Sequence, residues 1–280
     1  MSSAQIAAYG SFAALAAWCA YLVNVVVPEP YMDEIIHVAQ AQAYCRGQWT
    51  SWDPRLTTPP GLYLITAAPA RLLKQASNKI CSVNALRTVN LIFLVLLPFV
   101  YTRLLDQLRH PILRSSTKGK QTPRDRDVQA REHEASALEG IVVAMFPVAA
   151  FFAFLYYTDL GGLSLILLSL TMGISKRWTL SALAGATSLL FRQTNIIWVA
   201  FIAATCAVRH LQPSSELFDP ALAQARWFDI PHALASLVKQ SLINIRVLVP
   251  VLARYTPVFA FALAFLRWNG GIVLDASCQF

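Results

Sequence analysis

The chain has 280 residues and a formal net charge of +8, yet 56% of its residues are hydrophobic and only 14% are charged. In a soluble domain about a quarter of the residues are charged, so this composition excludes an ordinary soluble protein and favours a polytopic, all-α membrane protein. The basic residues gather in loops without interleaved aromatic side chains. That pattern argues against nucleic-acid binding and matches the lysine and arginine excess of cytoplasmic loops.

The first apolar run, Ile6–Val27, is long enough to span a bilayer and ends at Pro28. No basic region precedes it and no cleavage site follows it, so we expect it to stay as a helix rather than to be removed as a signal peptide. Residues 28–60 then form an acidic, partly aromatic loop with a short helix-forming stretch in its middle. Trp49 and Trp52 in this loop are typical of the headgroup level of a membrane.

About seven or eight membrane segments are expected, all within one membrane-embedded domain covering residues 1–280. Gly61–Leu73 is short, so it is either a short span or a re-entrant piece. The other apolar runs are Val83–Tyr101, Ile141–Tyr157, Leu163–Ile174, Leu180–Phe191, Ile196–Val208 and Ser241–Leu266. Residues 103–137 are predicted to be a basic flexible loop and residues 209–240 a polar connector.

The side of the membrane that each loop faces depends on Gly61–Leu73. If this segment does not cross, the basic loops lie in the cytosol, and the acidic loop, Asp159 and Arg192 face the opposite compartment. If it does cross, the basic region near Arg103–Arg131 lies outside, against the positive-inside rule. Because long loops translocate regardless of charge, the sequence leaves both arrangements open.

The cysteines show no CxxC spacing, so neither a disulfide framework nor a zinc site is predicted. There are five: Cys19, Cys45, Cys81, Cys206 and Cys278.

The segment directly after the first apolar run carries an unusual set of polar side chains. Asp33 and Glu34 are adjacent carboxylates, and His37 lies four residues after Asp33, on the same face of a helix. A half-buried carboxylate can have a raised pKa and accept a proton from a substrate hydroxyl. The alternative is an ordinary solvated helix start, where acidic residues are favoured. An acid and a histidine supply too few ligands for a metal, so no metal site is predicted.

Two further polar positions interrupt apolar stretches. Asp159 follows an apolar run directly, where it is either a substrate contact or a helix cap. Arg192, Gln193 and Asn195 lie in a polar break inside a long apolar region. An arginine at such a depth faces a cavity, a phosphate or an acid partner. The alternative to phosphate binding is a structural ion pair between Arg192 and Asp159.

Four segments carry distinctive combinations of residues: YMDEIIHVAQAQAYCRGQWTSWDPRLTTPPGLYL, FLYYTDLGG, FRQTNIIWVAF and NGGIVL. Together they resemble the eukaryotic endoplasmic-reticulum alpha-1,2-glucosyltransferase family, one of the GT-C glycosyltransferases. The segments occur in the order of the family, and the resemblance covers nearly the whole chain. It implies a GT-C-like helical bundle in the endoplasmic-reticulum membrane, with a lumenal first loop that carries short helices.

The resemblance also implies an activity. The enzyme transfers glucose from dolichyl phosphate glucose to a dolichyl-diphosphate oligosaccharide that already carries two glucoses, with inversion from a beta-linked donor to an alpha-1,2-linked product. By this resemblance Asp33 and Glu34 are the expected catalytic residues, and no cofactor is expected. The expected substrate-binding residues are His37, Asp159, Arg192, Gln193 and Asn195.

The chain departs from the family after NGGIVL. Family members are longer, with further spans, and the motif continues there with Gly-Asp, whereas this chain ends Asp275-Ala276-Ser277-Cys278-Gln279-Phe280. A C-terminally truncated form is therefore expected. Two other functions remain open at this point: an inactive truncated paralogue that acts as a regulator, and a membrane transporter whose polar residues line a path.

Overall fold

The computed structural model describes residues 2–72, 80–116, 123–212, 216–220 and 223–268, and within these ranges every regular element is helical. The NGGIVL motif and the residues after it lie outside the described part. The helices are α1 (Ser3–Val26), α2 (Glu34–Cys45), α3 (Gly61–Leu72), α4 (Val83–Ser116), α5 (Pro123–Ala144), α6 (Pro147–Ala153), α7 (Asp159–Ile174), α8 (Trp178–Leu189), the 3₁₀ helix η1 (Gln193–Asn195), α9 (Ile196–Leu211), α10 (Asp229–Ile243) and α11 (Ile245–Trp268).

Four described helices are long and apolar enough to cross a membrane: α1, α4, α9 together with η1, and α11. The α5–α6 pair, bent by 67°, makes a fifth if it is counted as one span. The prediction of an all-α, multi-pass membrane protein is confirmed, but the predicted seven or eight segments are not. Helix α7 has 16 residues and α8 has 12, which at about 1.5 Å per residue is less than the thickness of a hydrocarbon core.

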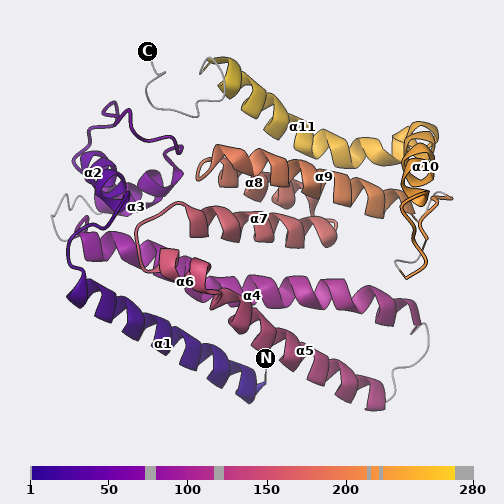
Figure 1. The fold of residues 1–280 in the computed structure, drawn as a ribbon, viewed down its shortest axis with the longest axis horizontal. Helices are drawn as coiled ribbons and strands as arrows, with labels where there is room; N and C mark the ends of the chain where they lie inside the picture. Colours follow the sequence, from indigo (N-terminus) through magenta and orange to yellow (C-terminus); the bar gives the residue numbers. More distant parts are fainter. Residues whose placement is uncertain (1, 73–79, 117–122, 213–215, 221–222, 269–280) are drawn as a thin grey trace.

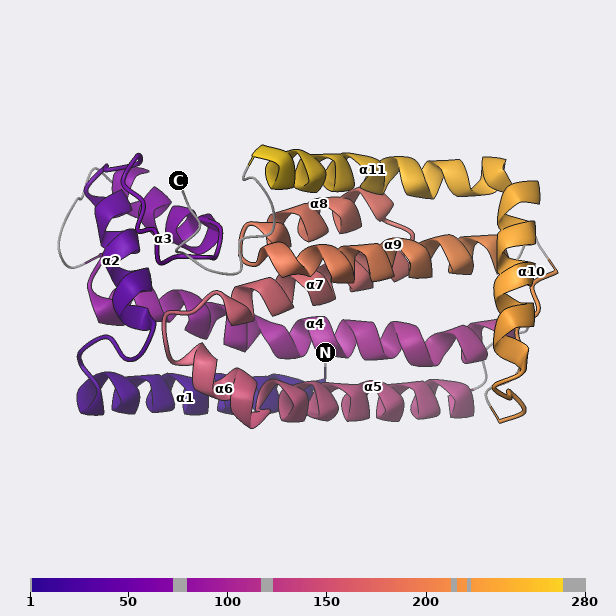
Figure 2. The ribbon, with the colours of Figure 1, turned by 45° about the horizontal axis from the view of Figure 1, so that its top comes forward.

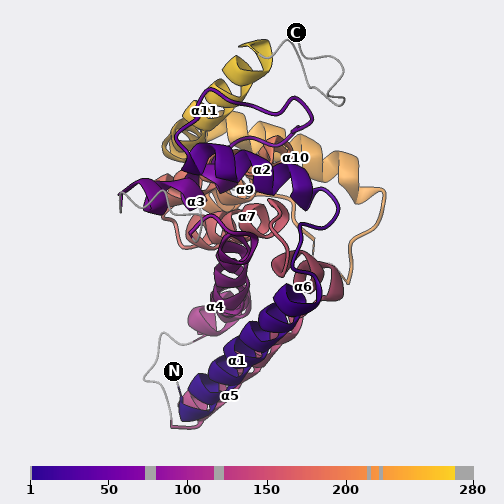
Figure 3. The same cartoon turned by 90° about the vertical axis from the view of Figure 1, so that its left-hand side faces the viewer.

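The long helices lie side by side in layers, and short helices occupy the two ends of the bundle. Helices α1 and α5 form one outer layer, α4 lies next to them, α7, α8 and α9 follow, and α11 is outermost (Figures 1 and 2). Helices α2 and α3 lie at one end, which Figure 3 views head-on, and α10 crosses the opposite end. Buried clusters join the layers, such as Phe12 of α1 with Leu97 of α4 and Ile202 of α9 with Val251 of α11.

Helices α4 and α5 occupy most of the region expected to be a flexible basic loop, so that prediction is wrong for the described part of residues 103–137. The two helices pack as a hairpin whose charges pair across it. The Asp106 carboxylate forms a hydrogen bond with the His133 ring, and Arg109 forms an ion pair with Glu139. Composition alone suggested disorder because it cannot show that opposite charges meet.

Helix α10 begins within the predicted polar connector, residues 209–240, and runs three residues beyond it, and none of its residues is buried. Ile230, Leu234, Val238 and Leu242 recur every four residues and are all exposed, with exposed fractions from 48% to 70%. An exposed apolar stripe on a helix that crosses the end of a membrane bundle is typical of a helix lying in the interface plane.

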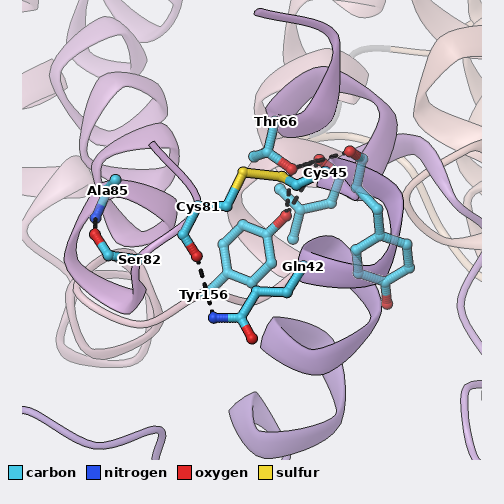
Figure 4. The surroundings of a disulfide bond; sticks show 9 residues. Gln42, Cys45, Thr66, Cys81, Ser82, Ala85 and Tyr156 are labelled. Carbon is cyan, nitrogen blue, oxygen red and sulfur yellow. Dashed lines mark hydrogen bonds between the residues drawn. A yellow bond between two sulfur atoms is a disulfide. The ribbon is translucent and has the colours of Figure 1, made fainter. Parts of the chain in front are cut away.

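The prediction that the cysteines form no disulfide is wrong, since Cys45 at the end of α2 is bonded to Cys81, just before α4 (Figure 4). The partners are 36 residues apart, so no short spacing motif revealed them. They meet because α2 packs against the start of α4, where Gln42 Nε2 also donates to the Cys81 carbonyl at 3.1 Å.

The disulfide also limits how the chain between its two cysteines can cross a membrane. Residues 45 and 81 must share one compartment, so the chain between them, with the short helix α3, begins and ends on the same side. Disulfides persist in oxidising compartments. The disulfide thus favours the arrangement in which the acidic loop faces away from the cytosol, which stays a prediction.

Candidate active site

The polar break between α8 and α9 lies where α3 and α7 both begin. The Gly61 N–H donates to the Leu190 carbonyl at 2.7 Å, and a Cβ at residue 61 would lie only 2.5 Å from that oxygen. A Cβ at Gly161 would lie 2.3 Å from the Phe191 ring. The backbone thus approaches the break at distances that only glycine allows, which brings the starts of α3 and α7 against it.

Arg192 and Asp159 meet at this junction as an ion pair between guanidinium Nη1 and carboxylate Oδ1. The structural pair that the sequence left as an alternative is therefore present. Asp159 is not a helix cap, because Thr158 occupies the N-cap position of α7. Both side chains keep a large exposed fraction, 45% for Arg192 and 33% for Asp159, so other N–H groups of the guanidinium remain open to a ligand.

The other two polar residues of the break have different surroundings. Asn195 is buried, and its amide nitrogen donates to the Ser188 carbonyl at 3.0 Å, which holds the ends of α8 and α9 together. Gln193 is half-buried in η1. The structure thus gives Asn195 a role in shaping the break, and substrate binding by Gln193 and Asn195 stays a prediction.

Asp33 lies just before α2, with an exposed side chain, and no described residue forms an ion pair with its carboxylate. Its backbone N–H donates to the Tyr157 hydroxyl at 3.0 Å, which ties it to the segment that leads into α7. Met32 directly before it has φ 55°, in the left-handed region that non-glycine residues rarely adopt. Such backbone strain persists only where the surroundings impose it, and it is common at functional sites.

In contrast to the exposed Asp33, the side chain of Glu34 is fully buried, with 0% exposure. The carboxylate receives two hydrogen bonds from Arg87, at 2.8 and 2.7 Å, and one each from the backbone N–H groups of Tyr31 and Tyr156. The sequence predicted two adjacent catalytic carboxylates, whereas the structure exposes one and surrounds the other with donors.

His37 is only 7% exposed, and its Nδ1 lies 2.6 Å from the Tyr63 hydroxyl. Burial lowers the pKa of the His37 imidazole below its ordinary value of 6.5, although the carboxylates of Asp33 and Asp159 act in the opposite direction. The imidazole is therefore neutral at neutral pH. The ring centroids of Tyr157 and His37 are 5.5 Å apart, and the Tyr157 hydroxyl accepts the Asp33 N–H. Asp159, two residues after Tyr157, pairs with Arg192, so the predicted site residues gather around the segment that leads into α7.

Sequence reasoning assigned no role to Arg87, Tyr63 or Tyr157. A signal for Arg87 was present, because an arginine in the first turns of an apolar span needs an acid partner, but the sequence did not show which acid it meets. The tyrosines carried no such signal, because aromatic residues near a membrane surface are common. No group of three His, Cys, Asp or Glu side chains that could hold a metal ion occurs among the described residues.

Comparison with known proteins gives the site a context. The chain is 34% identical over 284 residues to the Dol-P-Glc:Glc(2)Man(9)GlcNAc(2)-PP-Dol alpha-1,2-glucosyltransferase of Aspergillus fumigatus, covering 90% of this chain and 44% of that protein. It is 32% identical over 298 residues to the protein of the same name from Mus musculus, covering 97% of this chain and 58% of that protein. For the Arabidopsis thaliana protein of that name the identity is 37%, over 65% of this chain and 34% of that protein.

The chain thus spans roughly half the length of the curated relatives it matches. No solved structure shows a significant match. The model of the DIE2/ALG10 family matches residues 27–278, a range that contains Asp33, Asp159 and Arg192. On this match, the chain belongs to the DIE2/ALG10 family.

Proposed function

We propose that this chain carries the active site of an inverting glucosyltransferase. It moves glucose from dolichyl phosphate glucose to the diglucosylated dolichyl-diphosphate oligosaccharide in an alpha-1,2 linkage. Family membership supports the reaction, because the relatives bear the name of that transfer. No feature of the described residues favours the transporter alternative.

The observation that carries the proposal is the state of Asp33. Its carboxylate is exposed and has no ion-pair partner among the described residues, and the buried His37 follows it by one helical turn. A carboxylate that acts as a general base must be accessible to the substrate and must not be neutralised by an ion-pair partner. Most other carboxylates at this end fail that condition: Glu34 is buried against Arg87, Asp53 pairs with Arg55, and Asp159 pairs with Arg192.

In the proposed reaction the Asp33 carboxylate takes the proton from the 2-hydroxyl of the acceptor glucose. The hydroxyl oxygen attacks the anomeric carbon of the donor glucose from the face opposite the phosphate. The bond between that carbon and the phosphate oxygen breaks, and the electron pair leaves with dolichyl phosphate. A phosphate leaving group needs no added proton, so one base and one stabilising cation are sufficient.

Arg192 is the cation proposed to stabilise the departing phosphate. Guanidinium groups form forked hydrogen bonds to phosphate oxygens. Asp159 orients Arg192 before the donor binds, since the pair joins the start of α7 to the break before α9. Binding of the donor phosphate adds contacts at the exposed N–H groups.

The proposed location is the membrane of the endoplasmic reticulum, with the site on the lumenal side. The Cys45–Cys81 disulfide supports this, because the lumen is oxidising and the bond holds the last residue of α2, the helix that Asp33 directly precedes. The polyprenyl chains of donor and acceptor then lie in the bilayer beside the apolar helices.

The test is a transfer assay on the purified chain in lipid nanodiscs, with dolichyl phosphate glucose and the diglucosylated lipid-linked acceptor. We expect a product one hexose heavier, with the new glucose released by an alpha-1,2-specific glucosidase, and no product with dolichyl phosphate mannose. An intact, folded chain that transfers no glucose would overturn the proposal and favour a non-enzymatic regulator.

A further inference from the structure

Arg87 connects more segments of the site than any other side chain described above. Its guanidinium, 3% exposed, donates to the Glu34 carboxylate through Nε and Nη2 at 2.8 and 2.7 Å. Nη1 donates to Asn24 Oδ1 and to the Val27 carbonyl, and Nη2 also donates to the Glu29 carbonyl. All five N–H groups of an arginine are thereby engaged. One side chain on α4 thus holds the end of α1, the following loop and the start of α2.

Both carboxylate oxygens of Glu34 also accept hydrogen bonds from more than one segment. Besides its two bonds from Arg87, it accepts the Tyr31 N–H at 3.0 Å and the Tyr156 N–H at 2.7 Å. Those two residues flank the site, because Tyr31 precedes Asp33 by two positions and Tyr156 belongs to the segment before α7. The Glu34 carboxylate therefore sets where the backbone around Asp33 lies relative to α7.

The other end of α2 is held to the same segment of the chain. Cys45, its last residue, is bonded to Cys81, six positions before Arg87 in the sequence. The 12-residue helix α2 is thus fastened at its start by an ion pair and at its end by a disulfide, both to residues 81–87. A helix fixed at both ends has no hinge about which its first residues can swing.

We propose that Arg87 and Glu34 are positioning residues, which with the Cys45–Cys81 disulfide form a clamp that fixes the Asp33 carboxylate in the active site. The strained φ of 55° at Met32 is the backbone conformation that this clamp imposes next to Asp33. Glu34 takes no proton in the reaction. The inference rests on the proposed function for the role of Asp33, and on the contacts alone for the clamp itself.

The kinetic test compares Glu34→Gln, Arg87→Lys and Arg87→Gln with the unchanged full chain, all corrected for the amount of folded protein. Misplacement of a catalytic group by about 1 Å costs on the order of 100-fold in rate, so we expect kcat to fall about 10- to 100-fold, with the KM for the donor changed much less. Arg87→Lys keeps the buried charge and should retain the most activity, because it loses only the fork.

The pH profile separates positioning from a purely structural role. Arginine stays charged in proteins, so Glu34→Gln leaves a cation near Asp33 without its partner. That cation lowers the pKa of the base, and the acidic limb of kcat/KM moves to lower pH. Arg55→Gln is the matched control, since it breaks an exposed arginine–aspartate pair in the same loop and should change neither kcat nor the limb.

Amide hydrogen exchange over residues 31–37 is the second readout, and it requires no activity. Glu34→Gln and Arg87→Gln should speed exchange there, while Arg55→Gln should not. If the variants fold and kcat, the acidic limb of the pH profile and the exchange rate are all unchanged, the clamp is overturned. If all three variants fail to fold, the clamp is also overturned, because the Arg87–Glu34 pair then has only a structural role. An unchanged chain without transfer activity, together with faster exchange in the variants, sinks the proposed function and leaves the clamp standing.

Discussion

Asp33 and Glu34 are neighbours in the chain, yet the structure places them in opposite environments. Glu34 is fully buried among four donors, whereas Asp33 is exposed next to Tyr157. Two features separate them: the left-handed conformation of Met32 directly precedes Asp33, and Glu34, the first residue of α2, meets Arg87 of α4. At the residue scale, chemistry in this site depends on which carboxylate the backbone leaves free.

Arg192 offers a direct test of phosphate stabilisation. Removing a group that stabilises transition-state charge typically costs about 10²–10³-fold in kcat, so Arg192→Ala should lose activity by that factor, and Arg192→Lys should lose less. The assay is glucosyl transfer at equal protein levels. Arg254→Ala is the control, because Arg254 on α11 is also exposed and its Nε donates to the Thr179 hydroxyl of α8. Equal activity of Arg192→Ala and the unchanged chain would remove Arg192 from the site.

His37 predicts a specific pH dependence of stability. Burial lowers its pKa in the folded state below the ordinary 6.5 of the unfolded state, so below that value the unfolded chain binds a proton that the folded chain does not. The contribution of neutral His37 to the free energy of unfolding is complete above about pH 6.5 and is lost as the pH falls toward the lowered pKa. The melting temperature of the unchanged chain should therefore drop more on acidification than that of His37→Gln. His232→Gln, in the exposed α10, is the control and should leave the drop intact.

At the scale of elements, the disulfide makes α2 part of the rigid bundle instead of a loose loop. Closing a loop of this length contributes about 2–4 kcal/mol to the free energy of unfolding. The double variant Cys45→Ser with Cys81→Ser should therefore melt at a lower temperature in detergent. Cys19→Ser, which alters a free, half-buried cysteine in α1, should not. If mass spectrometry of the alkylated, unreduced chain finds free thiols at both positions, the bond does not form.

Individual elements show how far the sequence could predict the fold. The long apolar runs near Ile6–Val27 and Val83–Tyr101 lie in helices α1 and α4, because hydrophobicity over a whole span is a strong signal. Helix α5 was missed, since its charges are neutralised by partners on α4 that are distant in sequence. The disulfide was missed for the same reason: contact between distant segments leaves no trace in local spacing.

The candidate site shows the same limit. Asp33, Asp159 and Arg192 were recognisable because polar residues in an oily chain stand out. That Glu34 is buried and Arg87 is its partner depends on how α2 packs against α4, which a single sequence does not contain. The sequence identified Asp33 and Glu34 as candidates but could not show which of the two is exposed and which is buried.

At the scale of the whole molecule, the disulfide and the candidate site lie at the end of the bundle that holds α2 and α3. We propose that α2 and α3 lie on the lumenal side, so a glycosylation acceptor site inserted near Ser51 should be modified in microsomes. A site in a tail added before Ser3, at the other end of α1, should stay unmodified. Modification of the tail and not of the loop would reverse the orientation.

The measurement that tests the central claim most directly is glucosyl transfer by Asp33→Asn. The change is nearly isosteric and removes only the ability to take a proton, so folding and protein abundance should be preserved. Loss of a general base typically lowers the rate by about 10²–10⁴-fold, and that loss is the expected result. Asp53→Asn, the same exchange in the same loop, should transfer glucose at the normal rate. Transfer by Asp33→Asn at the rate of the unchanged chain would contradict the account.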